Sequence, residues 1–212
     1  MNIFFLTLAT LILGSLYYGL LMPAAARGDL TRGLAKFFKG MNELGGYVHD
    51  TAMSQFIPPT LIHVATGTWT MVAGQVAGTI SKHKGAAGET TVVTVPIIIP
   101  SNSVDGKGSY LKSIELDYEI QTADLTSITP LIHLVTRAVE TAAMAAPVAQ
   151  TFTQSPTAAN SKTQDQHKLV LTITTPFWID NDQYVLAEFT CVCAAGSILD
   201  IYGAVANYTL RA

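Results

Sequence analysis

Residues 113–121 read SIELDYEIQ, and this stretch alternates strictly between apolar and polar side chains. The apolar members are Ile114, Leu116, Tyr118 and Ile120. The polar members are Glu115, Asp117, Glu119 and Gln121. Because successive side chains of a β-strand point to opposite faces of its sheet, this period of two predicts a strand with one face in a core and the other in solvent.

Two later stretches repeat the alternation. HKLVLTITTP at 167–176 places Leu169, Leu171 and Ile173 on one face. YVLAEFTCVC at 184–193 does so with a second apolar set: Val185, Ala187, Phe189, Cys191 and Cys193. Further strands are predicted at 60–65, 68–73, 91–99, 128–136 and 198–210. About eight short strands with no long helix between them predict an all-β domain over 60–212, an antiparallel β-sandwich of jelly-roll or Greek-key type.

The segments between these strands are rich in turn formers. KHKGAAGE at 82–89, PSNSVDGKGS at 100–109, TADLTS at 122–127 and DND at 180–182 are predicted to be turns or loops. One connection, 138–163, is too long for a hairpin and has no strong period. It is interpreted either as a loop that contacts a partner or as a flexible segment.

The N-terminal stretch has a different character. No Asp, Glu, Lys, Arg or His occurs from Met1 through Ala26, and residues 3–22 form about 20 mostly apolar or small positions, enough to cross a bilayer core as a helix. Residues 1–28 are therefore expected to be a transmembrane anchor. Cleavage as a signal peptide at residues 24–26 and a core helix of a soluble domain stay open as alternatives. Small side chains at Gly14, Ser15 and Gly19 favour close packing of two such helices in the membrane.

Residues 29–46 are predicted to form a basic amphipathic helix, followed by a connector at 47–59. One side carries an apolar stripe: Leu30, Leu34, Phe37, Phe38, Met41 and Leu44. Four basic residues follow the apolar run: Arg27, Arg32, Lys36 and Lys39. The last three lie on the side of the helix opposite the apolar stripe. We expect these four, with Phe37 and Phe38, to lie at an anionic membrane surface. The alternative is that the stripe packs on the β domain. Since the basic residues follow the span, the C-terminal domain is expected on the cytoplasmic or interior side of the membrane.

The overall composition limits the class of partner. Only 13% of the residues are charged and the net charge is −3, which argues against a dedicated nucleic-acid binder. A surface this poor in charge favours coverage by a lipid bilayer, further copies of the chain or partner structural subunits. The two cysteines, Cys191 and Cys193, are too far apart on one strand face for a relaxed disulfide and are predicted to be free thiols.

No catalytic or metal-binding motif is present. The five histidines are scattered, and His63 and His133 lie in apolar strands, where core or interface positions are expected. Asp180 and Asp182 suit a turn as well as a calcium loop. We therefore expect no enzyme activity, no cofactor, no metal and no small-molecule substrate.

The C-terminal half, from HKLVLTITTPFWIDNDQYVLAEFT through SILDIYGAVANYTLRA, resembles uncharacterised jelly-roll-type structural proteins of phages and other viruses. The resemblance implies a virion or capsid component. Together with the anchor, it favours a membrane-anchored structural protein that self-assembles through its β-sandwich. Two alternatives are an accessory subunit of a membrane complex and a secreted carbohydrate-binding sandwich. In the latter, Trp69 or Trp178 would form a sugar platform, although each lies in an apolar context that favours burial in the core.

Overall fold

The computed structural model describes residues 50–74, 78–101, 108–137 and 146–211. The expected anchor at 1–28, the amphipathic helix at 29–46 and the connector residues up to 49 lie outside these ranges. Among the described residues, none forms a helix with the length and hydropathy needed to span a membrane.

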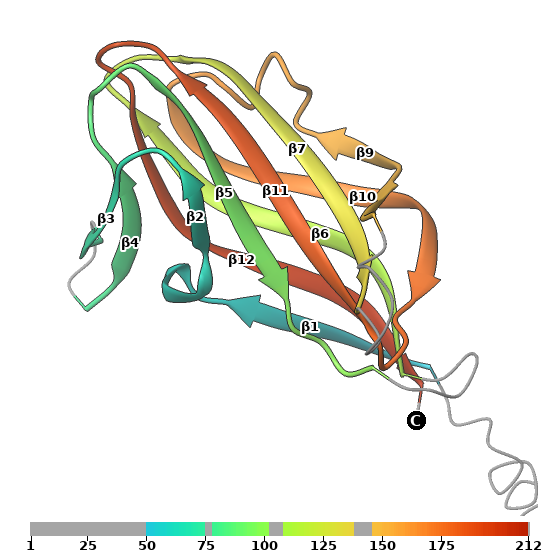
Figure 1. The fold of residues 1–212 in the computed structure, drawn as a ribbon. Helices are drawn as coiled ribbons and strands as arrows, with labels where there is room; N and C mark the ends of the chain where they lie inside the picture. The colour runs from blue at the N-terminus through green and yellow to red at the C-terminus, as the bar shows by residue number, and fades with distance from the viewer. Residues whose placement is uncertain (1–49, 75–77, 102–107, 138–145, 212) are drawn as a thin grey trace, which may run out of the picture. The chain divides into compact units, whose positions relative to one another are not determined.

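The described chain folds into two facing antiparallel sheets, which confirms the predicted β-sandwich (Figure 1). The seven-stranded sheet has the order β3-β4-β12-β6-β10-β9, with β1 also paired to β12. Its strands are β1 (Thr51–Ile57), β3 (Trp69–Ala73), β4 (Ile80–Lys84), β6 (Gly108–Gln121), β9 (Phe152–Ser155), β10 (Asp165–Trp178) and β12 (Ile198–Arg211).

The five-stranded sheet has the order β2-β5-β11-β7-β8. Its strands are β2 (His63–Thr66), β5 (Glu89–Ile97), β7 (Leu125–Thr136), β8 (Val148–Gln150) and β11 (Gln183–Cys193). A short 3-10 helix, η1 (Pro59–Leu61), connects β1 in the first sheet to β2 in the second. Pro58 and Pro59 restrict the backbone here, so the strand predicted at 60–65 begins only at His63.

The alternation in the sequence determines which side chains form the core. All twelve residues predicted to face inward from 113–121, 167–176 and 184–193 are at most 4% exposed. Burial of each large apolar side chain stabilises the fold by about 1.5–3 kcal/mol. Cys191 and Cys193 are free and buried, as predicted, and burial raises the pKa of both thiols.

Four short strands were not predicted, so the described residues contain twelve strands where about eight were expected. β1 lies inside the segment interpreted as a connector, and β4 overlaps a segment interpreted as a loop. β8 and β9 lie inside the segment 138–163. These strands have three to seven residues and do not alternate cleanly between apolar and polar, because β1, β8 and β9 lie at sheet edges and β4 buries a serine and a lysine, Ser81 and Lys84, in place of apolar side chains.

The described part of the long connection is held to the sandwich. The Leu125 amide donates to the Lys162 carbonyl over 2.9 Å, and the Tyr118 hydroxyl donates to the Ser161 carbonyl. Over 146–163 the segment is therefore part of the fold, contrary to the flexible interpretation. The predicted turn at Asp180 and Asp182 is confirmed, since the Gln183 amide donates to the Asp180 carbonyl over 3.0 Å.

Candidate functional site

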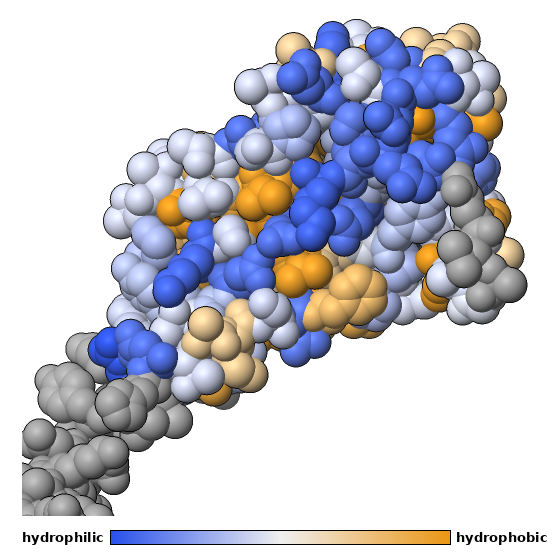
Figure 2. Space-filling model, turned by 180° about the vertical axis from the view of Figure 1, so that it is seen from behind, coloured by the Kyte–Doolittle hydropathy of each residue, from blue (hydrophilic) through white to orange (hydrophobic). Residues whose placement is uncertain are grey.

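A groove of about 520 Å³ lies on the seven-stranded sheet where β4, β6, β10 and β12 run side by side. It is lined by Thr79, Ile80, Asp117, Tyr118, Gln166, His167, Lys168 and Tyr202. Figure 2 shows the molecule from the side opposite to Figure 1, with a band of hydrophilic residues crossing the surface between hydrophobic patches. We refer to the cavity defined by these eight residues as the groove.

Strand register brings the polar residues of the groove together. Asp117 on β6 is opposite Lys168 on β10, and Glu119 is opposite Gln166. On the other side of β6, Asp117 is opposite Gly203 of β12. The outward polar face predicted for residues 113–121 therefore becomes one row of a polar surface built from three strands.

The electrostatics of the groove centre on Asp117. Burial raises the pKa of its carboxyl, the nearby Lys168 opposes that shift, and the carboxylate of Glu115 adds to it. Lys168 forms an ion pair with Glu115 at 3.0 Å, and this contact raises the pKa of the lysine. A titratable group with a shifted pKa in a cavity is typical of a functional site.

A β-bulge shapes the groove on the β12 side. The register between β12 and β6 shifts between Ile201 and Gly203, which makes Tyr202 the extra residue. The Tyr202 hydroxyl donates to the carboxylate of Glu119, and burial together with this contact raises the pKa of the phenol. The bulge thus holds an aromatic ring in the wall of the groove.

An exposed aromatic ring lies against β12 at Gly203, the residue after Tyr202. Phe56 on β1 is 53% exposed, and its ring lies against the backbone of Gly203. A Cβ at position 203 would be 2.7 Å from two ring carbons of Phe56, so only glycine leaves room for this arrangement. Ile80, 45% exposed, adds a second apolar side chain at the groove.

A buried carboxylate next to β4 has a structural explanation. Asp200 is 6% exposed, accepts hydrogen bonds from Ser81 (3.2 Å) and Gln121 (3.0 Å), and lies 2.9 Å from Nδ1 of His83. These are the residue types of a hydrolase triad, but the serine hydroxyl is directed at the carboxylate, whereas nucleophile activation requires it to face the histidine. The cluster holds β4 against β12.

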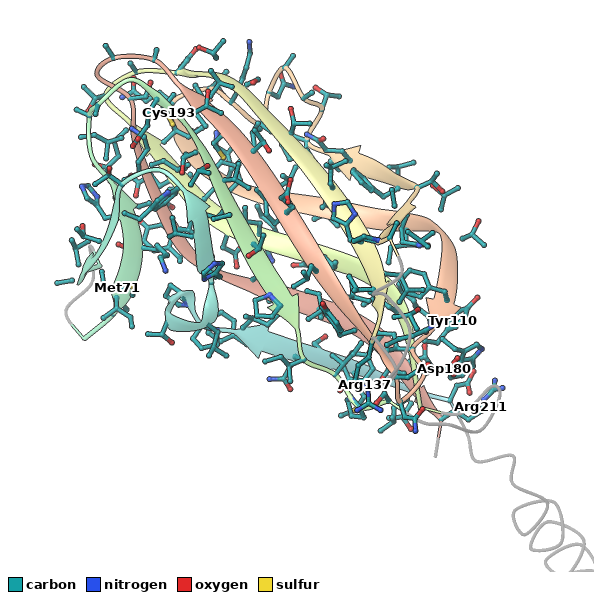
Figure 3. All side chains as sticks on the ribbon, viewed as in Figure 1. Met71, Tyr110, Arg137, Asp180, Cys193 and Arg211 are labelled. Carbon is teal, nitrogen blue, oxygen red and sulfur yellow. The ribbon has the colours of Figure 1, made fainter. Side chains whose placement is uncertain are left out.

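A second polar and aromatic cluster lies at one end of the sandwich. The rings of Tyr110 and Trp178 are 4.9 Å apart, and the Arg211 guanidinium lies 5.0 Å from the Trp178 ring centre. Arg211 also pairs with Asp50, with Nε at 2.6 Å from Oδ1. Figure 3 shows the labelled Tyr110 and Arg211 at this end and Cys193 toward the other.

The expectation that both tryptophans are buried in the core is corrected by this arrangement. Trp69 is half-buried and packs against the core, with its indole N–H donating to Thr91 Oγ1. Trp178 is also half-buried, but its neighbours are Tyr110 and Arg211 at the surface. Arg211 and Tyr110 therefore cover part of the Trp178 ring surface that a sugar platform would need. His63 is exposed and His133 half-buried, so neither is a core residue.

The site residues predicted from the sequence all lie outside the described residues. They are the membrane-surface set Arg27, Arg32, Lys36, Phe37, Phe38 and Lys39 and the helix-packing set Gly14, Ser15 and Gly19. Sequence reasoning missed the groove, because Asp117 was interpreted only as part of a solvated strand face. The available signal was the repetition of three carboxylates on one face of one strand, at Glu115, Asp117 and Glu119.

No protein-family model and no curated protein sequence matches the chain. Among solved structures, a family 29 carbohydrate-binding module matches with a TM-score of 0.35 and 10% identity, over 74% of this chain and 92% of that chain. A family 11 carbohydrate-binding module from Clostridium thermocellum, in complex with a β-1,3-1,4-mixed-linked tetrasaccharide, matches with a TM-score of 0.34 and 6% identity, over 76% and 89%.

The enzymatically active domain of tailspike protein 4 of bacteriophage CBA120 also matches, with a TM-score of 0.34 and 10% identity. This match covers 69% of the chain and 19% of the tailspike chain. All three TM-scores are below 0.5, and no functional conclusion is drawn from these likenesses.

Proposed function

We propose that the β-sandwich is a non-enzymatic binding domain that takes an uncharged saccharide in the groove. The observation that carries this proposal is the convergence of a carboxylate, an amide and an ammonium group, from Asp117, Gln166 and Lys168, beside the Tyr202 ring. This corresponds to the carbohydrate-binding alternative, with the groove in place of the tryptophan platform.

The chemistry of these groups matches a ligand rich in hydroxyls. The Asp117 carboxylate accepts hydrogen bonds, the Lys168 ammonium donates them, and the Gln166 amide does both, as adjacent sugar hydroxyls require. The apolar face of a pyranose ring packs favourably on an aromatic surface, and Tyr202 provides one beside these polar groups.

The charges at the groove disfavour anionic ligands. Glu115, Asp117 and Glu119 lie in one row on β6, and Lys168, the basic residue of the groove lining, is already paired with Glu115. A phosphate or a polyuronate would meet this row of carboxylates without a matching cluster of basic residues. A neutral saccharide avoids that repulsion.

Calorimetric titration of the full chain against neutral oligosaccharides of glucose, xylose, mannose and galactose tests the proposal. Asp117→Ala is expected to weaken binding by about 10- to 100-fold, because hydrogen bonds to a charged group contribute about 1.5–3 kcal/mol. Gln166→Ala removes a neutral amide, whose hydrogen bonds contribute about 0.5–1.5 kcal/mol, and is expected to weaken binding by about 2- to 10-fold. Glu188→Ala, on β11 of the other sheet, is the matched control and should bind like the parent. The saccharide should be recovered unhydrolysed. Undiminished affinity in Asp117→Ala, or no binding of any oligosaccharide, would reject the groove as the site.

A membrane-anchored structural role is the second candidate. It is supported by the uncharged run over residues 1–26, the basic residues that follow it and the 13% share of charged residues. It predicts that the chain stays in the membrane fraction after alkaline carbonate extraction, with residues 3–22 still attached to the β domain. A mature chain that starts at Arg27 and is found in the soluble fraction would contradict anchoring and would leave the saccharide proposal unaffected.

A further inference from the structure

We infer that β1 is a dimerisation edge, through which two copies of the chain pair as antiparallel strands about a two-fold axis. The inference is independent of the saccharide proposal. It identifies a surface for the self-association that the composition suggested.

β1 is an open edge within the described part of the chain. Its partner is β12, along the register Thr51↔Leu210 to Ile57↔Ala204. Six of its seven residues are exposed. In Figure 1, β1 runs along the margin of the seven-stranded sheet, with β12 on one side. Backbone groups along an open edge can pair with an incoming strand.

The other edge strands of the described fold are shorter or irregular. β2 has four residues and a register shift between Val64 and Thr66, and β8 has three residues. β9 has four residues and is followed by Pro156, and β3 has five. Short strands, irregular pairing and proline are common ways of blocking edge-to-edge association. β1 has seven residues and no bulge in its pairing with β12, so it lacks the first two of these devices, and Pro58 follows it only after its last residue, as Pro156 follows β9.

The residues of β1 are compatible with a second copy of the same strand. Antiparallel pairing centred on Ser54 places Ser54 opposite Ser54, Met53 opposite Gln55, and Ala52 opposite Phe56. No charged residue lies in the strand, so two copies meet without like-charge repulsion. Met53 and Phe56 are 39% and 53% exposed, and each gains apolar contact against a partner strand.

One backbone acceptor in β1 is engaged by a neighbouring side chain. The Gln55 side-chain amide donates to the Phe56 carbonyl over 3.0 Å. Because both groups belong to exposed residues of the strand, this bond can be exchanged for one to a partner strand. On the outer face, the pairing sets each Phe56 ring over Ala52 of the other copy and joins two seven-stranded sheets into one.

Cysteine cross-linking of the full chain tests the pairing directly. In Ser54→Cys the two new thiols lie opposite each other with Cβ atoms about 4.5–5.5 Å apart, within reach of a disulfide after a small adjustment. A covalent dimer is expected on a non-reducing gel. Ala149→Cys, in the exposed edge strand β8, is the matched control and should form no covalent dimer on that gel. Cys191 and Cys193 are buried and should not contribute.

Ser54→Lys tests the same two-fold axis without a covalent cross-link, because it places two like charges directly opposite each other. Light scattering after size-exclusion chromatography should show a dimer for the parent chain and a dissociation constant raised at least about fivefold for Ser54→Lys. Ala149→Lys should leave the dimer unchanged, and circular dichroism confirms folding of each variant. A monomeric parent chain would overturn the inference. So would a dimer that persists in Ser54→Lys while Ser54→Cys fails to cross-link. Either result would indicate that another segment covers or replaces this edge.

Discussion

Replacement of Gly203 by alanine offers a sharp test of how β1 and β12 fit together. Gly203 has a φ of +144°, which L-residues rarely adopt. An alanine Cβ would also lie 2.9 Å from the Ile57 carbonyl oxygen and 2.7 Å from the Phe56 ring. The backbone conformation costs about 1–3 kcal/mol, and crowding against a fixed carbonyl adds a similar amount. We therefore expect Gly203→Ala to reduce the free energy of unfolding by about 2–6 kcal/mol.

Urea unfolding followed by tryptophan fluorescence measures this loss of stability. A double-mutant cycle with Phe56→Ala separates the part due to the Phe56 ring from the part due to the backbone conformation and the Ile57 carbonyl. Removal of the ring relieves one contact, but the positive φ and the Ile57 carbonyl remain. Gly203→Ala should therefore retain at least half of its cost in the Phe56→Ala background, with a coupling of about 1 kcal/mol. A Gly203→Ala variant as stable as the parent would refute the reasoning about the backbone, and complete rescue by Phe56→Ala would refute the contribution of the carbonyl.

Three further predictions concern buried polar groups. Burial raises the pKa of Asp117 above 3.8, so the free energy of unfolding of the parent falls as the pH rises through the folded-state pKa. Asp117→Asn should therefore have a higher urea midpoint than the parent at pH 7 and no advantage well below pH 3.8, and it should bind the saccharide more weakly. Lys84 is fully buried and donates hydrogen bonds to the carbonyls of Gly85 and Ala87, so Lys84→Ala should lower the free energy of unfolding by about 2–5 kcal/mol. An unchanged urea midpoint would contradict this role. Because burial raises the pKa of the Cys191 and Cys193 thiols, neither should react with Ellman's reagent at pH 8 until the chain is unfolded, and rapid labelling of the native protein would show that the core is open.

The core strands could be predicted because their physical requirement is local. In β6, β10 and β11 one face is buried, so the apolar side chains must recur at every second residue. The inward residues of these strands were identified correctly for that reason. The marginal strands could not be predicted in the same way, because β1, β4, β8 and β9 are defined mainly by backbone pairing, which leaves little pattern in the side chains.

Aromatic residues illustrate the limit of local context. Trp69 and Trp178 both follow apolar or small residues, and the same reasoning predicted burial for both. Only Trp69 packs against the core, whereas Trp178 comes at the end of β10, where it meets Tyr110 and Arg211. Phe177 packs against the core and Ile179 is 2% exposed, so the alternation of side chains directs Trp178, which lies between them, to the outer side.

The amino-acid sequence by itself determined the fold class and the core, because a period of two in hydrophobicity has one stable outcome when two sheets bury their inner faces. It also established the acidic outward face of 113–121. Tertiary structure alone decided what that face becomes. Asp117, Gln166 and Tyr202 are 36 to 85 positions apart in the chain and meet only through the pairing of β6 with β10 and β12 and the bulge at Tyr202. The physical reason is that strand pairing is set by backbone hydrogen bonds common to all residues, so the order of strands in a sheet is not written in any local pattern.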